Sequence, residues 1–532
     1  MRLYANTATG EATLDQCKND ADHPPGGEVS LMSNQLEAVP TTDATQDQVP
    51  AGTRAVIVGG GIAGIAAATV LTERGVSVRL LERDSQLGGR AGAWTETLGD
   101  GQRFEMERGF HAFFRQYYNL RALLRRVDPD LDHLAPVKDY PILGASGAVE
   151  SFAKLVRRSP FNVIQLTSRT TYMRFRDLFR VNAPAALEMF RYDSERTYAK
   201  YDDKSASDYL SSLNFPDKAR SMLFNVFSHS FFNREEEMSA AELLMMFHFY
   251  FTRNPEGLIF DVAQKPFSTA YWRPFAQYLE ERGASVRCDC EAYGLRRQQD
   301  RWIVDSSAGE LVADMVVLAV TVPALKALVD ASPELHEESW LQSIHSLELT
   351  RPFAVWRLWL NQPTAEERAP FAGVTEYECL HNISLYHLFE DESREWAQKS
   401  GGSVVELHAY AVDPMLSATD IKGSMLDGLH ELYPETRAAE ILEERFLLDQ
   451  DCPSFAPGSH SHRPTVETPF SGLCLAGDSV KLPIPSALME RAAASGMMAA
   501  NHLLAPLGVT PEPIATVPRR GLIAGRATRP RA

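Results

Sequence analysis

Apolar runs broken by glycines form the clearest pattern near the start of this chain. Residues 54–58 (RAVIV) predict a buried strand, residues 64–75 (GIAAATVLTERG) a helix, and residues 78–82 (VRLLE) a second strand. A strand, a helix and a second strand in this order are typical of a βαβ unit in a parallel sheet.

Elsewhere the pattern changes between blocks. Residues 117–127 predict a helix, because Leu120, Leu123, Leu124 and Val127 recur at helical spacing, and residues 150–255 read mostly as helices. Strands are expected at 284–288 (ASVRC), 301–307, 313–320, 351–361, 403–412 and 472–478 (GLCLAGD), and an Ala-rich helix at 486–504. The segments 351–361 and 403–412 resemble strands of a different, more amphipathic sheet. Segments of nucleotide-binding type therefore stand at the beginning, middle and end, with other material inserted between them.

Composition narrows the class of protein. The 532 residues are 44% hydrophobic and 23% charged, which is typical of a globular protein of two or more domains. A net charge of −17 argues against nucleic acid as a partner. No run of 18 uncharged apolar residues and no secretory signal are found, so we expect a cytoplasmic protein.

The six cysteines form no framework, and the close pair Cys288–Cys290 falls in a predicted strand without a second pair at zinc spacing. We expect reduced thiols and no metal. Residues 1–51, acidic and without hydrophobic period, predict a disordered leader, in which Met32 is an alternative start. The basic tail at 506–532 is expected to be disordered from Pro518 onward.

Gly59, Gly61 and Gly64 stand between the first strand and the helix, and Glu82 ends the second strand. This spacing predicts a dinucleotide site: the first glycine permits a tight turn, the second lets the backbone approach the pyrophosphate, and the third allows helix and strand to pack closely. Glu82 is placed to accept hydrogen bonds from ribose hydroxyls. The pattern fits either NAD or FAD.

Two further motifs favour FAD. A second glycine turn, Gly88-Gly89-Arg90, has no task in a plain NAD fold but suits the far side of a pyrophosphate or a flavin. Near the other end, Gly477 and Asp478 join a strand to the Ala-rich helix, so the carboxylate is placed for a ribityl hydroxyl and the helix N-terminus, led by Pro483 and Pro485, for the reduced flavin.

Together these motifs resemble the flavin-dependent amine oxidase and carotenoid desaturase superfamily over residues 52–505. The resemblance implies an α/β fold, with a Rossmann-like FAD-binding (GR2-type) domain and an interleaved α+β substrate-binding domain. The expected FAD-binding parts are 52–135, 255–330 and 465–505, and the substrate-binding parts are 136–254 and 331–464. It also implies that the backbone of Ala292 meets the adenine.

The inserted segments indicate an apolar substrate. An aromatic and methionine-rich segment suits a tunnel for a long hydrocarbon, although an ordinary core explains it equally well. Its members are Phe224, Phe227, Phe231, Phe232, Phe247, Phe249, Tyr250, Phe251 and Phe260, with Met222, Met238, Met245 and Met246. Residues 154–180 mix seven basic residues with apolar ones, which predicts peripheral membrane contact, with a solvated basic face as the alternative.

At finer grain the chain resembles the β-carotene desaturase/methyltransferases, known as isorenieratene synthases. The similar stretches are 106–127 (MERGFHAFFRQYYNLRALLRRV), 201–210 (YDDKSASDYL) and 475–501. The resemblance implies that a β-ionone ring becomes an aromatic φ-ring while a methyl group moves to the adjacent carbon. Hydride removal, a 1,2-methyl shift and proton loss lead towards aromaticity, and no S-adenosylmethionine is then required.

Three side chains are candidate bases: Glu107, His111 and Glu490. Each also has a structural interpretation, as an ion-pair partner of Arg108, a core histidine among phenylalanines, and a packing residue of the last helix. No Rieske-type Cys/His cluster is found, so we expect a quinone or oxygen to accept the electrons.

Other functions remain open from the sequence. An acyclic carotenoid desaturase, a carotene isomerase or a flavin amine oxidase uses the same fold, and Rab GDP-dissociation inhibitors show that a related fold also serves as a lipid-binding protein without flavin. The intact glycine pattern, Glu82, Arg90 and Asp478 argue against that last alternative.

Overall fold

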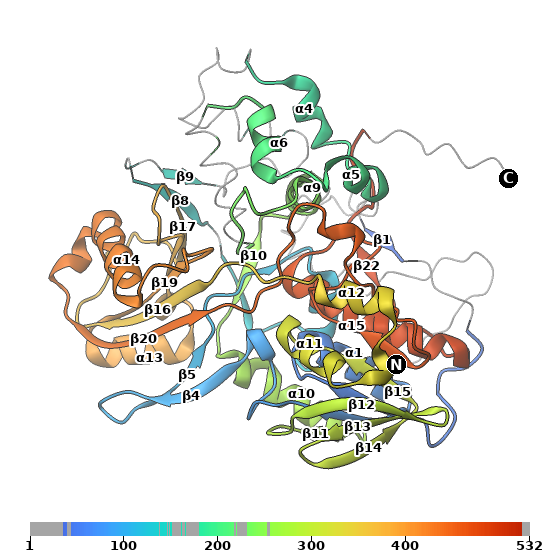
Figure 1. Ribbon diagram of the computed structural model, residues 1–532. Coiled ribbons are helices and arrows are strands. Elements are labelled where there is room, and N and C mark those ends of the chain that lie inside the picture. Colours follow the sequence, from blue (N-terminus) through green and yellow to red (C-terminus); the bar gives the residue numbers. More distant parts are fainter. Residues whose placement is uncertain are drawn as a thin grey trace, which may run out of the picture.

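The computed structural model describes residues 36–39, 44–137, 139–145, 147, 149–151, 161, 165, 180–216, 220, 231–252 and 256–523. A five-stranded parallel sheet and a seven-stranded mixed sheet dominate it, on opposite sides of the view in Figure 1.

The five-stranded sheet is built from segments far apart in the chain. Its order is β11 (Ser285–Arg287), β3 (Ser77–Leu81), β2 (Arg54–Val58), β15 (Met315–Leu318) and β21 (Leu473–Leu475), and every pair is parallel. The predicted βαβ unit is confirmed as β2, α1 (Ile62–Glu73) and β3.

Two helices of small residues cover this sheet. The whole length of α1 is buried up to Thr72, and α15 (Leu488–Leu504) packs along it (Figure 1). A Cβ built on Gly496 of α15 would stand 2.1 Å from the carbonyl oxygen of Ala63, so only glycine allows the helices to approach this closely. Helix α10 (Arg273–Glu280) also contacts α1.

A three-stranded antiparallel sheet, β12 (Ala292–Gln298), β13 (Arg301–Ser306) and β14 (Gly309–Ala313), flanks the parallel one. Helices α11 (Val322–Asp330) and α12 (Glu338–His345) follow β15. The Cys288–Cys290 stretch is not in a strand as predicted: β11 ends at Arg287, and Asp289 has a positive φ of 50° that breaks extended pairing.

The seven-stranded sheet has the order β20, β16, β19, β18, β17, β8 and β9. Its strands are β20 (Ile441–Asp449), β16 (Phe353–Leu360), β19 (Ser403–Ala409), β18 (Asn382–Leu385), β17 (Phe371–Thr375), β8 (Pro141–Gly144) and β9 (Val149–Ser151). Helices α13 (Asp391–Ser400) and α14 (Ala418–Leu432) contact β19.

The prediction that 351–361 and 403–412 form strands is confirmed, but the expected amphipathic character is wrong. Every residue of β16 and β19 is buried, because one face packs on a core that includes Met425 of α14 and the other faces the rest of the molecule.

Several shorter strands and helices accompany the two sheets. The strands are β4 (Ala93–Thr97), β5 (Arg103–Glu107), β6 (Phe113–Phe114), β7 (Leu134–Pro136) and β10 (Phe260–Ala263), and the helices are α2 (Tyr118–Leu124), α4 (Ala183–Glu188), α5 (Ser194–Tyr201), α6 (Ala206–Ser212) and α9 (Ala240–Phe247). Helices α4, α5 and α6 lie together at the top of Figure 1.

The two ends of the described chain meet, which differs from the expected disorder. Strand β1 (Glu37–Ala38) pairs with β22 (Ala515–Thr516), and Gly521 N–H donates to the carbonyl of Tyr192 at 2.7 Å. Residues 36–39, 44–51 and 518–523 are thus ordered, because each end supplies backbone partners that composition does not reveal.

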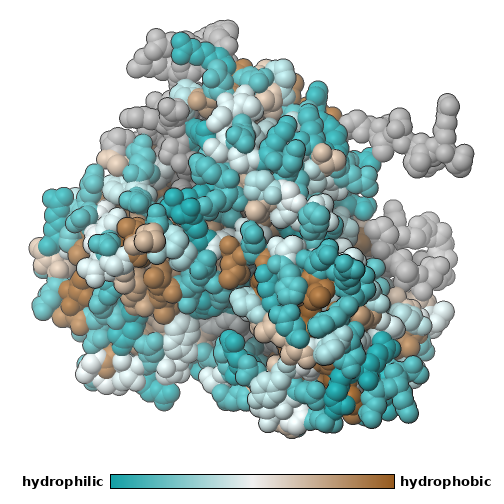
Figure 2. All heavy atoms as spheres, in the orientation of Figure 1, coloured by the Kyte–Doolittle hydropathy of each residue, from teal (hydrophilic) through white to brown (hydrophobic). Residues whose placement is uncertain are grey.

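On the face that Figure 2 shows, hydrophobic residues form small groups separated by hydrophilic ones. Within the residues that the structure describes, helices long and apolar enough to span a membrane are absent.

Candidate functional site

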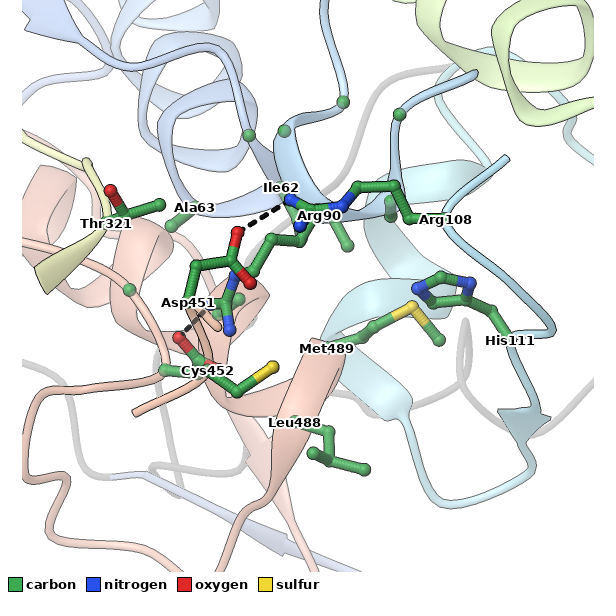
Figure 3. Close-up of a pocket in the computed structure, with 18 of the residues that line it drawn as sticks. Ile62, Ala63, Arg90, Arg108, His111, Thr321, Asp451, Cys452, Leu488 and Met489 are labelled. Carbon is green, nitrogen blue, oxygen red and sulfur yellow. Dashed lines mark hydrogen bonds and ion pairs between the residues drawn. The ribbon is translucent and has the colours of Figure 1, made fainter. Parts of the chain in front are cut away.

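A cavity of about 1470 Å³ opens between the two sheets (Figure 3). The carboxyl ends of β2, β3, β15 and β21 line one part, and β16, β17, β18 and β19 line the other. Pockets for one small molecule usually measure about 300–1000 Å³. The volume therefore has room for a cofactor and a substrate together.

The first glycine turn follows β2 and opens α1. Gly59 has φ +103°, and a Cβ there would stand 2.3 Å from the carbonyl oxygen of Ala319. A Cβ on Gly64 would stand 1.9 Å from the Gly59 carbonyl oxygen. Gly59 and Gly61 line the cavity, whereas Gly64 lies behind them and lets the helix start close to the turn.

Glu82 holds this turn from the end of β3. Its carboxylate accepts the N–H of Gly60 at 2.6 Å and the N–H of Asp84 at 2.9 Å. Burial raises the pKa of Glu82, although both hydrogen bonds oppose that shift. The side chain lines the cavity, as a ribose-binding carboxylate must.

The Gly88-Gly89-Arg90 turn lies directly on the first glycine turn. Gly88 N–H donates to the Gly60 carbonyl at 2.8 Å, and a Cβ on Gly89 would stand 3.1 Å from the Cα of Gly61. Across the cavity, the guanidinium of Arg90 donates to the carboxylate of Asp478. Two motifs separated by 388 residues are thus brought into contact.

Gly477 and Asp478 line the cavity between β21 and α15. Gly477 has φ +138°, its N–H donates to the Ser495 hydroxyl at 2.8 Å, and a Cβ there would stand 3.8 Å from the Ser479 hydroxyl oxygen, an ordinary contact distance. Helix α15 begins at Leu488, a little later than predicted, and Leu488 has a positive φ of 51°. Leu488 and Met489 lie at the cavity wall (Figure 3).

Ala292 is half-buried at the start of β12 and also lines the cavity. It stands beside the end of β3, since Cys290 N–H donates to the carbonyl of Glu82 at 2.8 Å. Nine residues were predicted to bind the cofactor, and all of them except Gly64 line the cavity.

Of the candidate bases, His111 lies at the cavity wall with its ring directed inward (Figure 3). Its Nδ1 is 2.7 Å from the carbonyl oxygen of Gly109. The ring proton must then sit on Nδ1, which leaves the lone pair on Nε2. Burial lowers the pKa of His111 to about 4, so the ring is neutral near pH 7.

Glu107 lies behind the wall. Its carboxyl group accepts the N–H of Phe267 at 2.9 Å, is 3.9 Å from Arg357, and has a pKa that burial raises to about 8. The pairing of Glu107 with Arg108 does not form, because Arg108 binds Asp449 and Asp451 at 2.7 and 2.6 Å.

Glu490 does not line the cavity. Its carboxyl group accepts the backbone N–H groups of Asn119 and Leu120, at 3.0 and 2.9 Å, at the start of α2. Burial raises its pKa to about 8. Both oxygens are occupied by this helix terminus, so we do not carry Glu490 forward as a base.

The geometry is that of a dinucleotide site joined to a second chamber, the part of the same cavity that β16, β17, β18 and β19 line. A comparison with protein families agrees. A family model described as flavin containing amine oxidoreductase matches residues 62–504. The chain belongs to this family. It is therefore an FAD-dependent oxidoreductase.

Two curated relatives of this family member carry the name carotenoid phi-ring synthase. The protein of Streptomyces griseus is 45% identical over 87% of this chain and 90% of its own length. The protein of Chlorobaculum tepidum is 28% identical over 91% and 93%. A probable zeta-carotene desaturase of Synechococcus elongatus is 24% identical over 85% of this chain and 98% of its own.

Solved structures of the flavin oxidoreductases share the fold. Putrescine oxidase matches with a TM-score of 0.63 at 15% identity, covering 85% of this chain and 99% of that one. A putative protoporphyrinogen oxidase from Exiguobacterium matches with a TM-score of 0.60 at 17% identity, covering 86% and 99%.

The residues present fit FAD. Gly477 has no side chain where it lines the cavity, which lets a group approach its backbone, and the first glycine turn presents the N-terminus of α1 to the cavity. In the described part of the chain, no group of three or more His, Cys, Asp or Glu side chains stands where it could hold a metal ion.

The aromatic segment divides between wall and core. Phe231, Phe232, Tyr250 and Phe260 line the cavity, while the other described members are buried elsewhere. Those buried members are Phe247, Phe249, Phe251, Met238, Met245 and Met246. Phe224, Phe227 and Met222 lie outside the described residues.

A polar group on this same wall was not predicted from the sequence. His408 and Tyr410 line the cavity, and Glu406 stands behind them on the same face of β19. Glu406 accepts from Arg357 of β16 at 2.8 Å. The signal was present: residues 404–410 (VVELHAY) place polar groups at every second position of a strand that is otherwise apolar.

Proposed function

We propose that this chain is an FAD-dependent carotenoid oxidoreductase that desaturates the β-ionone ring of β-carotene with a 1,2-methyl shift, giving an aromatic φ-ring. The observation that carries the proposal is 45% identity to a carotenoid phi-ring synthase over nearly the full length of both chains. The second chamber of the cavity supports it, because its wall suits a hydrocarbon ring.

Aromatic side chains make up much of that wall, including Phe110, Phe260, Phe371, Phe353 and Tyr140. Phe110 stacks on Phe371 with 4.5 Å between ring centroids. Such a wall excludes water from a reacting ring, and aromatic faces stabilise a positive charge that develops beside them.

The flavin, when bound, supplies hydride abstraction from a ring C–H bond. We propose that Gly59, Gly61, Gly64, Glu82 and Ala292 hold its ADP half, and that Gly89, Arg90, Gly477 and Asp478 hold the rest. The lining of the cavity supports this division, since the first set stands at β2, β3 and β12 and the second at the junction of the GGR turn with α15.

The proposed division into domains follows the two sheets. All strands of the parallel sheet fall within 52–135, 255–330 and 465–505, and all strands of the seven-stranded sheet fall within 136–254 and 331–464. We propose the first set as the FAD-binding domain and the second as the substrate-binding domain.

We propose peripheral attachment to a membrane, with a quinone or oxygen as electron acceptor. A water-insoluble substrate needs a route out of the bilayer, and the basic and apolar residues at 154–180 suit an anionic surface. Most of that segment lies outside the described residues.

Expression in a bacterial host that accumulates β-carotene tests the function. The expected pigment has the carbon count of β-carotene, fewer hydrogens by mass spectrometry and a trimethylphenyl end by NMR. A product formed only from acyclic carotenes, with β-carotene unchanged, would replace this proposal by an acyclic desaturase.

A further inference from the structure

The methyl shift ends with the loss of a ring proton, and the substrate chamber holds one connected set of hydrogen bonds that can receive it. Tyr410 is one of the residues that line the cavity. The hydroxyl oxygen is 2.8 Å from Nδ1 of His408, and Nε2 of the same ring is 2.8 Å from Glu406.

The direction of these hydrogen bonds follows from their neighbours. Asn382 donates from its amide to the Tyr410 oxygen at 2.7 Å, so the Tyr410 proton is free to point at His408. Phe110 N–H also approaches Nε2 of His408, but at 3.3 Å. The shorter contact, to a carboxylate, places the ring proton on Nε2, and Nδ1 then accepts from Tyr410.

Glu406, at the end of the set away from Tyr410, carries a carboxylate that stays ionised. Glu406 is fully buried, and burial alone raises a carboxyl pKa, but Arg357 at 2.8 Å outweighs this and the pKa of Glu406 falls to about 2. Its other oxygen faces the imidazole, so a positive charge on His408 would be paired at once.

The backbone makes room for this arrangement. Gly109 has φ +107°, and a Cβ there would stand 2.6 Å from Cε1 of His408. Any other residue at this position would push His408 away from Glu406 or from Tyr410. The segment that follows Gly109 carries His111, so both parts of the cavity wall depend on this glycine.

Tyr410 is connected through aromatic rings to another part of the cavity wall. Its ring is 5.0 Å from that of Phe232, which is 5.1 Å from that of Phe353. Phe353 packs with Cys452, lies 5.9 Å from the guanidinium of Arg108, and lines the cavity as Cys452 does. Cys452 and Asp451 are drawn together in Figure 3.

We infer that Tyr410, His408 and Glu406 form the proton-accepting relay of the reaction, with Tyr410 as the group that meets the ring. This rests on the proposed function. Once the methyl group has moved, the C–H bond next to the positive carbon breaks and its electron pair forms the ring double bond. The proton passes to the Tyr410 oxygen while the phenol proton passes to Nδ1 of His408, and the imidazolium pairs with the Glu406 carboxylate.

A phenol is a weak base in water, but a C–H bond beside a carbocation is a strong acid, so a weak, well-placed acceptor suffices. The relay returns to its first state when the product leaves and water takes up the proton. His111, which has no carboxylate partner in the described structure's hydrogen bonds, stabilises a new positive charge less well.

The test uses purified holoenzyme with β-carotene in detergent micelles. Bleaching of the bound flavin is measured under anaerobic conditions without an acceptor, and aromatic product under anaerobic conditions with a quinone added, because each ring loses two hydrides and one flavin accepts only one. The wild type is measured first. Tyr410→Phe and His408→Gln are then compared with Tyr433→Phe, a buried tyrosine of the core under α14 that does not line the cavity. Bound flavin per chain and the melting temperature confirm that each variant is folded.

We expect Tyr410→Phe to lower the rate of aromatic product formation by about 100-fold. Flavin bleaching should stay within a few-fold of the wild type, because hydride removal comes before proton loss. A double variant that combines Tyr410→Phe with His408→Gln should form aromatic product no more slowly than the slower of the two single variants, since the three groups of the relay act as one unit. Tyr433→Phe should match the wild type.

Three results would overturn the relay while leaving the proposed function intact: aromatic product at the wild-type rate in Tyr410→Phe, equal losses of bleaching and product, or multiplicative losses in the double variant. A wild-type holoenzyme whose flavin β-carotene does not bleach would instead overturn the proposed function, and the relay with it.

Discussion

Glu82 shows how one carboxylate organises the nucleotide end of the site. It accepts two backbone N–H groups, from Gly60 and Asp84, while it faces the cavity. The first glycine turn is therefore fixed from β3 rather than by its own residues. A ribose hydroxyl that binds this carboxylate is held by a group that is already rigid.

Replacing Glu82 with Ala should weaken FAD binding by about 10–100-fold, because a charge-assisted hydrogen bond is lost and Gly60 N–H is left without its partner. Titration of the apoprotein with FAD, followed by flavin fluorescence, measures this. Glu395→Ala, at an exposed position of α13, is the matched control and should bind as the wild type does. Equal affinities for both variants would remove Glu82 from the site.

His111 gives the protein a pH dependence of known sign. Burial lowers its pKa from 6.5 to about 4, so the folded protein binds this proton less readily than the unfolded chain. Its contribution to the free energy of unfolding is fully present above pH 6.5 and is lost as the pH falls toward 4.

We therefore expect the wild type to lose more stability than His111→Gln between pH 7 and pH 5. Urea denaturation of both proteins at the two pH values measures the difference. His462→Gln, at an exposed histidine outside the cavity, controls for a general effect of losing an imidazole. A wild type and a His111→Gln protein with the same pH slope would show that His111 is not neutral in the fold.

Helix α15 carries the cofactor end of the site because it lies so close to α1. The contact depends on Gly496, whose place no side chain can take without moving a helix. The N-terminal turn of α15, with Leu488 and Met489, faces the cavity, so a shift of the helix changes the shape of the cavity in which we propose that FAD binds.

Gly496→Ala should lower the free energy of unfolding by about 1–3 kcal/mol, as overpacking does, and should reduce the flavin bound per chain. Gly423→Ala in α14 is the matched control, because a Cβ there meets nothing within 4 Å. It should leave stability unchanged or raise it by up to about 1 kcal/mol. Thermal unfolding separates the two, and similar behaviour would contradict the packing explanation.

The elements that the sequence predicted well are those whose signal is local. An apolar run, a glycine turn and a second apolar run predict the unit of β2, α1 and β3, and a run of small residues predicts α15. The burial of both faces of β16 and β19 was not predictable from the sequence. Charged residues are mostly exposed, but a second layer of the fold buries Arg357 and Glu406. Cys288–Cys290 left its expected strand because of one positive φ at Asp289.

At the scale of the whole molecule, the site is assembled from segments hundreds of residues apart. The sequence supplied the members of each motif, including Arg90 and Asp478, but not the ion pair between them. It could not place Glu490 at the start of α2 or Glu107 behind the wall, since both positions depend on tertiary packing. The alternating polar residues of β19 were readable, but only the fold shows which side meets the cavity.

A water-insoluble substrate must reach the cavity from a membrane, and residues 154–180, inserted between the FAD-binding segments, are the proposed attachment site. If residues 154–180 bind an anionic membrane, Arg157→Ala and Arg158→Ala should each lower affinity for phosphatidylglycerol vesicles by about fivefold. Exposed Arg103→Ala on β5 is the control. Co-sedimentation measures binding, and equal binding to phosphatidylcholine vesicles would contradict an electrostatic attachment.

The most direct measurement is the pigment made when the gene is expressed in a host that accumulates β-carotene, analysed by chromatography, mass spectrometry and NMR. We expect β-carotene to be converted into a pigment of unchanged carbon count that has lost hydrogens and carries trimethylphenyl ends. Unchanged β-carotene in cells that contain the yellow, FAD-loaded protein would contradict ring desaturation as its function.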